Sequence, residues 1–295
     1  QITARCCRSI GIHPVAARRI GDRSAISSAN SCADGFSNSY GLWHFGRSNH
    51  RVQLMSDAKI RLYVEHPLAQ GQAVPLTQDQ AHYLFSVMRL GQGDAVLLFN
   101  GTDGEWRATV AQSAKRGGIL TCEAQTRPLH LPPDLWLLFA PIKKARTDFI
   151  VEKAAEMGAA RIIPVQTRHT NSDRIRQDRL QAHATEAAEQ CGGTFVPEVT
   201  DLQHLDRLLS TWPADRRILW CDESLTGART ALADAGHGPW AILIGPEGGF
   251  SAEEQKRLRA MPQVTPVSLG PRILRADTAA VAALTLWQSV LGDWV

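Results

Sequence analysis

The sequence predicts two folded parts, a small barrel-like β domain followed by a larger α/β domain with a mostly parallel sheet. Short strand-like segments separated by glycine turns predict the first domain over residues 55–130. Apolar runs that alternate with helical segments predict the second domain over residues 131–295. Residues 127–133 contain three prolines and are typical of a linker between the two domains.

Hairpin patterns predict the β domain. Glycine turns at residues 100–104 and 115–118 connect three strand-like segments, as expected for antiparallel hairpins. A helix is expected after Thr77, because threonine is a good N-cap and apolar residues follow on one helical face before Gly91. The expected strands of this domain are residues 61–64, 95–99, 105–111 and 119–124.

Continuous apolar strands joined by helices predict the larger domain, and this pattern is typical of a parallel sheet covered on both faces. Its expected strands are residues 135–140, 161–165, 217–221, 241–244 and 264–269. Its expected helices are residues 148–157, 179–190, 251–260 and a final helix that carries Val281–Leu291. Ligands of such sheets bind beyond the carboxyl ends of the strands, so glycine-rich segments directly after strands are the first candidates for a site.

The formal net charge of +3 comes from the N-terminal segment. Residues 1–54 hold seven Arg, two Asp and no Lys, which leaves 25 basic and 27 acidic side chains in the rest of the chain. Because residues 1–54 show no sustained helical or strand period, we expect a disordered or non-native extension, with Met55 as the natural start. An Arg- and Ser-rich transit peptide is the alternative for this segment.

The composition excludes several classes of protein. The longest apolar runs, residues 135–140 and 279–284, are far shorter than the roughly 18 residues that a membrane-spanning helix needs. Six cysteines include no CxxC pair, and the histidines show no paired-ligand spacing, so neither a disulfide scaffold nor a metal site is expected. We therefore expect a cytoplasmic protein with no membrane or metal partner.

Two glycine-rich segments follow expected strands. The first, Gly245–Phe250, precedes a helix that begins with the capping-box spacing of Ser251 and Glu254. The second, Leu269–Thr278, again links a strand to a helix. Glycine lets the backbone approach a ligand closely, but each loop taken alone is equally typical of a capped turn. Neither loop matches a P-loop or a dinucleotide-binding fingerprint.

Four motifs together carry a resemblance to a known family. They are FIVEKAAEMGAARIIPV at Phe149–Val165, EQCGG at Glu189–Gly193, GPEGGF at Gly245–Phe250 and LGPRILRADTA at Leu269–Ala279. With these motifs, about residues 58–292 resemble the ribosomal small-subunit RNA methyltransferase E family. The resemblance implies a PUA-like β-barrel RNA-binding domain followed by a SPOUT α/β methyltransferase domain with a C-terminal trefoil knot. It also implies transfer of a methyl group from S-adenosyl-L-methionine to N3 of a uridine in 16S rRNA of the small ribosomal subunit, by a homodimer.

The resemblance implies a cofactor pocket with two walls. The residues expected to bind the cofactor are Ile244, Gly245, Glu247, Gly248, Gly249, Leu269, Gly270, Ile273 and Leu274. Main-chain groups of these loops are expected to bind the adenine, with apolar side chains on either side of it. Glu189 and Gln190 end a helix before Gly192, and either face the nucleotide or form a frayed helix end.

The chemistry of the implied reaction selects candidate catalytic residues. Uridine N3 must lose a proton before it attacks the methyl group, and a guanidinium stabilises the developing anion. The candidates are Arg168, Arg272 and Arg275, each of which is equally well explained as a surface ion pair. Glu247 is a possible proton acceptor, although a role in holding the loop is favoured.

Basic residues near the expected site predict RNA contacts. Between Lys143 and Arg179 there are nine Lys or Arg against five Asp or Glu, which is enough for a local phosphate-binding surface. The residues expected to bind RNA are Arg61, Arg89, Lys143, Lys144 and Arg146.

Two other functions remain open from the sequence. One is a catalytically silent RNA-binding protein that acts in ribosome assembly, and the other is a SPOUT methyltransferase that acts on another RNA. Retention of glycine in both loops argues against the silent protein, because a lost cofactor site would free these positions to take larger residues.

Overall fold

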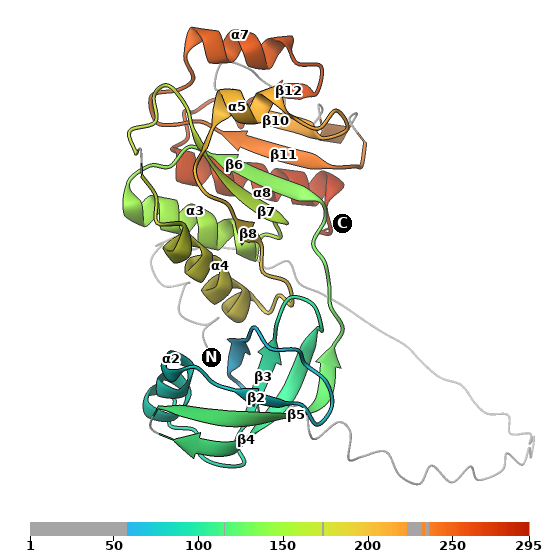
Figure 1. Ribbon diagram of the computed structural model, residues 1–295. Coiled ribbons are helices and arrows are strands. Elements are labelled where there is room, and N and C mark those ends of the chain that lie inside the picture. Colours follow the sequence, from blue (N-terminus) through green and yellow to red (C-terminus); the bar gives the residue numbers. More distant parts are fainter. Residues whose placement is uncertain (1–57, 115, 173, 223–231, 234–235, 295) are drawn as a thin grey trace, which may run out of the picture. The chain divides into compact units, whose positions relative to one another are not determined.

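The computed structural model describes residues 58–114, 116–172, 174–222, 232–233 and 236–294. The expected N-terminal extension, residues 1–54, therefore lies outside the described residues. No helix within the described ranges is long and apolar enough to cross a membrane. Two sheets organise the described chain, one of five strands and one of seven (Figure 1).

The first sheet forms the predicted barrel-like domain, with the strand order β1-β3-β4-β5-β2. Its pairs are antiparallel except for β1 and β3, which run parallel. Alternate residues point inward, so that Val96 and Leu98 of β3 are fully buried against Leu120 of β5. The strands are β1 (Arg61–Tyr63), β2 (Ala73–Pro75), β3 (Ala95–Phe99), β4 (Glu105–Ala114) and β5 (Gly117–Arg127).

The helix of this domain begins as predicted but changes its winding. Thr77 is the N-cap of α2 (Gln78–Ala81), and its side chain forms a capping box with Gln80. The chain then continues as a π-helix, η1 (His82–Val87), that buries Leu84. The π-helix was not predicted, because its apolar spacing is close to that of an α-helix.

The second sheet confirms the predicted parallel arrangement, since every recorded pair in it is parallel. Its order is β12-β10-β11-β6-β7-β8, with β9 paired to β7. The carboxyl ends of these strands therefore lie along one edge. The strands are β6 (Leu135–Phe139), β7 (Arg161–Gln166), β8 (Glu198–Val199), β9 (Gln203–His204), β10 (Arg217–Cys221), β11 (Trp240–Ile244) and β12 (Val264–Val267).

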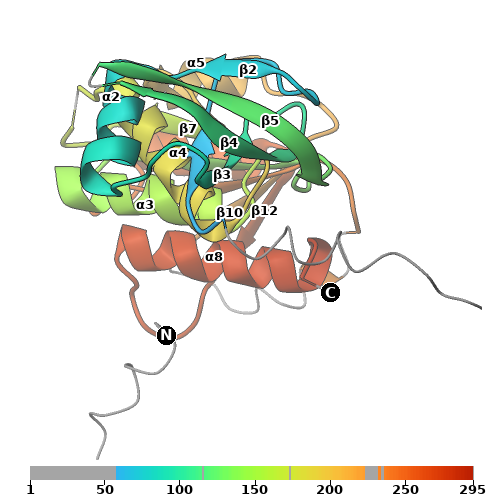
Figure 2. The same ribbon diagram turned by 90° about the horizontal axis from the view of Figure 1, so that it is seen from below.

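Helices cover both faces of this sheet. Leu137 and Phe139 of β6 belong to the core that includes Ile150 of α3 and Trp287 of α8, and Figure 2 shows α8 beside α3. Leu138, the alternate residue of β6, belongs to a second core that includes side chains of α5 and α7. The helices are α3 (Lys144–Glu156), α4 (Gln177–Cys191), α5 (Leu205–Ser210), α7 (Ala252–Ala260) and α8 (Ala276–Leu291).

Phe139 provides a test of this packing. Its side chain is fully buried in the core beneath α3 and α8, so Phe139→Ala should lower the free energy of unfolding by about 3–5 kcal/mol. The matched control is Phe149→Ala, because Phe149 is 39% exposed and its truncation should cost less than about 1 kcal/mol. Urea unfolding followed by tryptophan fluorescence measures both, and equal losses would contradict the assignment of Phe139 to the core.

Candidate functional site

A cavity of about 520 Å³ lies at the carboxyl ends of three neighbouring strands, β12, β10 and β11. Both glycine-rich segments reach it, one from β11 and the other from β12. The end of β10, which lies between these strands, adds Trp220, Cys221 and Asp222. Burial raises the pKa of the Cys221 thiol to about 12, so this thiol stays protonated at neutral pH.

The first glycine loop is shaped by close approaches. A Cβ at Gly245 would lie 2.6 Å from the ring of Phe250, and Phe250 in turn packs edge-on against Trp220. Gly249 has a φ of 69°, in the left-handed region that favours glycine. The loop ends at Ser251, whose side chain caps α7 in the predicted capping box with Glu254.

The loop after β7 is tied to the first glycine loop. The buried carboxylate of Glu254 accepts hydrogen bonds from the backbone N–H of Ser251 and of Arg168, each at 2.8 Å. The Nδ1 atom of His169 lies 3.2 and 3.1 Å from the carbonyl oxygens of Gly248 and Gly249. These contacts bring segments about 80 residues apart in the sequence into one structure.

The second glycine loop supplies positive charge to the cavity. Arg272 and Arg275 both line it, and among the described residues neither guanidinium has a recorded ion-pair partner. Gly270 has a φ of 126°, which a side chain rarely tolerates, and its backbone N–H donates a hydrogen bond to the Ser268 hydroxyl oxygen. Ile273 lines the same cavity and is 80% exposed.

Arg146 connects the two sides of the cavity from the first turn of α3. Its Nη1 atom lies 3.5 Å from Oε1 of Glu247 in the first glycine loop. Its Nε atom lies 3.7 Å from Oδ2 of Asp277, in the first turn of α8. One guanidinium thus lies between two carboxylates at the rim. Because all three side chains are partly exposed, each ion pair contributes only modestly to stability.

Two further hollows continue along the same edge of the sheet. The first, of about 350 Å³, shares Pro246 and Glu247 with the cavity and is also lined by Lys143, Lys144 and His169. The second, of about 280 Å³, shares Lys144 with the first. Its other charged lining residues are Asp148, Arg174, Arg176 and Arg179.

The cavity brings together all the site residues predicted from the two loops. All nine positions expected to bind the cofactor line it, and so do Arg272 and Arg275. Arg168 is exposed on the neighbouring loop and is not among the lining residues. Trp220, Cys221 and Asp222 were missed, because the sequence does not reveal that β10 lies between β11 and β12.

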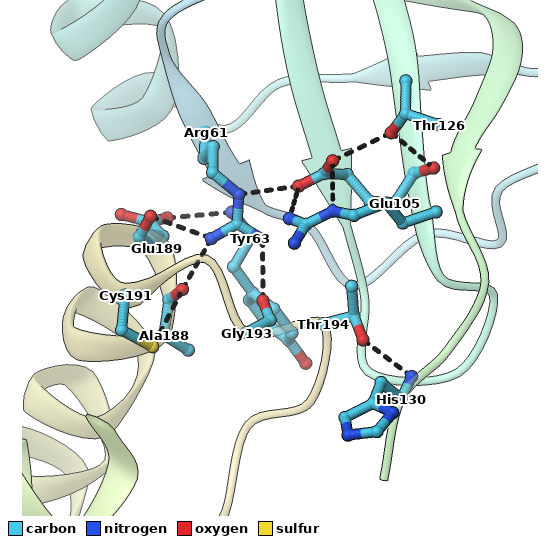
Figure 3. A network of polar contacts seen from close by, with 11 residues as sticks. Arg61, Tyr63, Glu105, Thr126, His130, Ala188, Glu189, Cys191, Gly193 and Thr194 are labelled. Carbon is cyan, nitrogen blue, oxygen red and sulfur yellow. Dashed lines mark hydrogen bonds and ion pairs between the residues drawn. The ribbon is translucent and has the colours of Figure 1, made fainter. Parts of the chain in front are cut away.

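Arg61, which was predicted to bind RNA, lies in a contact between two parts of the chain and not on the exposed surface. The Arg61 side chain is only 12% exposed, and it bonds to Glu105 and to backbone carbonyls at the end of α4 (Figure 3). Glu189, which was an open candidate to face the nucleotide, accepts the backbone N–H of Tyr63 instead. Lys143, Lys144 and Arg89 are exposed, as an RNA-binding role requires.

Two family models match the chain. An RNA methyltransferase domain matches residues 130–288, and an RNA methyltransferase PUA domain matches residues 76–121. A ribosomal RNA small subunit methyltransferase E from Synechocystis is 31% identical over 74% of this chain and 73% of its own length. The enzyme of that name from Rickettsia conorii is 29% identical over 76% of this chain and 93% of its own.

Solved structures with the same fold carry a ligand. A Legionella pneumophila methyltransferase in complex with the cofactor S-adenosylmethionine (SAM) has a TM-score of 0.73 at 28% identity, covering 79% of this chain and 98% of its own. A Neisseria gonorrhoeae ribosomal RNA small subunit methyltransferase E bound to S-adenosylmethionine has a TM-score of 0.72 at 26% identity. The match covers 80% of this chain and 99% of the Neisseria chain.

The fold and the site define the class of protein as an RNA methyltransferase that joins a PUA-like domain to an α/β methyltransferase domain with a parallel sheet. Within this class, the chain belongs to the ribosomal RNA small subunit methyltransferase E family.

Gly245 tests the shape of the cavity. Valine at this position would clash with Phe250 and displace the first glycine loop, so Gly245→Val should raise the Kd for S-adenosylmethionine by about tenfold or more. Gly91→Val is the control, because a Cβ at Gly91 meets only Asp94 at 3.8 Å. Calorimetric titration measures both affinities, and circular dichroism checks the fold. Parent-like affinity in a folded Gly245→Val protein would contradict the assigned pocket.

Proposed function

We propose that this chain transfers the methyl group of S-adenosyl-L-methionine to N3 of a uridine in 16S rRNA of the small ribosomal subunit. The observation that carries the proposal is the meeting of two glycine-rich loops, distant in sequence, in one cavity of about 520 Å³. The names of the curated relatives and the ligand of the two solved structures support the same donor and class of substrate.

The cavity suits the donor in size and in chemistry. Its volume falls within the range typical of pockets for cofactors and other small molecules. The glycines leave main-chain N–H and C=O groups accessible to a polar ligand, while Ile244, Leu269, Ile273 and Leu274 offer apolar surface to an adenine ring.

The two arginines of the second loop have a role in the proposed reaction. Uridine loses its N3 proton to water, the N3 lone pair forms a bond to the methyl carbon, and the carbon–sulfur bond breaks to leave S-adenosylhomocysteine. The negative charge that develops on the uracil ring before the attack needs positive charge nearby. Arg272 and Arg275 line the cavity, and their guanidinium groups supply this charge.

The target uridine would occupy the hollow next to the cavity. This hollow shares Pro246 and Glu247 with the cavity, so a base placed there lies beside the donor. Arg168 is exposed and directly precedes His169, which lines this hollow. Because Glu247 pairs with Arg146, we assign it a role in the pocket wall, and proton acceptance by Glu247 is the alternative.

The RNA strand would continue into the hollow lined by Arg174, Arg176 and Arg179. Two of these guanidiniums are paired with Asp178 and Asp148, so the phosphate contacts fall mainly to Arg174 and Lys144. Exposed Arg89 would extend the positive surface onto the β domain.

We also propose a cytoplasmic homodimer. A second copy would cover Ile273, which lines the cavity and is 80% exposed, and so would close the pocket to water. Light scattering on the purified protein measures this oligomeric state.

Transfer of labelled methyl groups tests the proposed function. Residues 55–295 are incubated with labelled S-adenosylmethionine and small ribosomal subunits that lack the modification, and the nucleosides are identified by mass. The proposal predicts 3-methyluridine. Donor binding without a product on this RNA would favour another RNA substrate, and the absence of both would favour a catalytically silent RNA-binding protein.

The pH dependence of methyl transfer tests the role of the arginines. Arg272→Ala and Arg275→Ala should each lower kcat by about tenfold or more at neutral pH while changing the Kd for S-adenosylmethionine by less than about twofold. The difference in kcat between each variant and the parent protein should shrink as the pH rises, because more uridine is then deprotonated at N3 without a guanidinium nearby. A deficit that is constant with pH, or an equal loss of donor binding, would contradict stabilisation of the anion.

Salt dependence tests the RNA contact of Lys144. Lys144→Ala should raise the KM for small subunits and lower the slope of log affinity against log salt by about 1, since one phosphate contact is lost. Lys256→Ala is the control, because Lys256 is exposed on α7 and lines neither the cavity nor the two hollows. An equal salt slope for Lys144→Ala and the parent protein would show that Lys144 does not contact a phosphate.

A further inference from the structure

The EQCGG motif, residues 189–193, lies at the C-terminal end of α4 and does not line the cavity. Gly192 ends the helix with a φ of 82°, a left-handed C-cap. The last carbonyl groups of any helix lack partners within the helix and carry its partial negative charge. The carbonyl oxygens at the end of α4 can therefore accept hydrogen bonds from a cation.

Arg61 of β1 is that cation (Figure 3). Its Nη1 atom donates to the carbonyl oxygens of Ala188 at 2.6 Å and Glu189 at 2.9 Å. Its Nη2 atom donates to the carbonyl oxygen of Gly193 at 2.7 Å. Arg61 belongs to the β domain, whereas all three acceptors belong to the methyltransferase domain.

Glu105 holds Arg61 from the other side. This carboxylate is 3% exposed and accepts the Nε–H of Arg61 at 2.7 Å, the Nε–H of Arg127 at 3.0 Å and the Thr126 hydroxyl at 2.8 Å. Burial alone would raise the pKa of Glu105, but the hydrogen bonds from Arg127, Arg61 and Thr126 outweigh it and hold the pKa below its usual value. The buried carboxylate is thus ionised, and the two guanidinium groups and the hydroxyl stabilise its negative charge.

Neighbouring contacts reinforce the same junction. The backbone N–H of Tyr63 donates to Oε1 of Glu189 at 2.8 Å, and the N–H of His130 donates to the Thr194 hydroxyl at 2.9 Å (Figure 3). The guanidinium of Arg61 also lies 4.5 Å from the centre of the Phe99 ring. Arg61 uses four N–H contacts in a planar fork, which the point charge of a lysine cannot reproduce.

From this geometry we propose that the EQCGG segment is the docking site of the β domain, and that Arg61 is the positioning residue that fixes this domain relative to the catalytic cavity. A bound RNA that contacts both domains is then presented with its target nucleotide at a set distance from the donor. The catalytic consequence rests on the proposed function, whereas the junction itself does not.

Arg61→Gln tests the proposal, because glutamine keeps much of the length but loses the charge and most of the donors. The KM for small subunits should rise by about tenfold, while the Kd for S-adenosylmethionine should stay within about twofold of the parent value. Amide hydrogen exchange should accelerate at Tyr63 and over residues 189–194, and the strands of both sheets should keep their protection.

Arg107→Gln is the matched control for this substitution. Arg107 pairs with Glu123 within the β domain and has no recorded contact with α4, so its loss should leave exchange at residues 189–194 unchanged. A second variant, Glu189→Gln, keeps an oxygen that accepts the Tyr63 N–H and should retain methyl transfer within about twofold. A large loss of kcat in Glu189→Gln would overturn the docking role, because it would place the carboxylate in the reaction.

Unchanged KM and unchanged exchange in a folded Arg61→Gln protein would overturn the proposal. Loss of donor binding together with RNA binding would overturn it as well, because Arg61 would then support the whole fold. If the parent protein yields no methylated rRNA, the proposed function fails separately, and hydrogen exchange alone decides whether the junction exists.

Discussion

The parallel alignment of the second sheet is the constraint on which the rest of the site depends. With every recorded pair parallel, the segments that follow β12, β10, β11, β6 and β7 all emerge at one edge, in this spatial order. The cavity occupies the first three of these positions and the lysine-lined hollow the next ones. The places that we propose for the donor and for the target nucleotide are therefore neighbours because of the strand order.

Much of this arrangement was predictable from the sequence. Buried strands appear as continuous apolar runs, so the strands at residues 95–99 and 217–221 have the predicted bounds. The glycine loops were found because ligands of parallel sheets bind beyond the carboxyl ends of the strands, and because the motifs of these loops together resemble those of a known family. Strand order is not visible in a single sequence, however, and for this reason the contribution of Trp220 from β10 was missed. The two-residue strands β8 and β9 are too short to show a period.

The arginines show the limit of sequence reasoning about charge. Arg61 and Arg275 look alike in a sequence, yet one is 12% exposed and bonded to carbonyls about 130 residues away, whereas the other is exposed at the cavity. Composition indicates how much positive charge a chain carries, but only the fold decides which guanidinium meets a carboxylate and which remains available to a ligand. The separation of these two roles lets one protein hold its domains together and still present positive charge to RNA.

A structure of the protein with S-adenosylhomocysteine and a small-subunit rRNA fragment tests the central claim most directly. The account predicts S-adenosylhomocysteine between the two glycine loops, in the cavity at the ends of β12, β10 and β11. It predicts the target uridine in the adjacent hollow beside Lys143 and His169, with N3 directed at the sulfur. A donor bound elsewhere, or a uridine that reaches the sulfur from another side of the cavity, would contradict it.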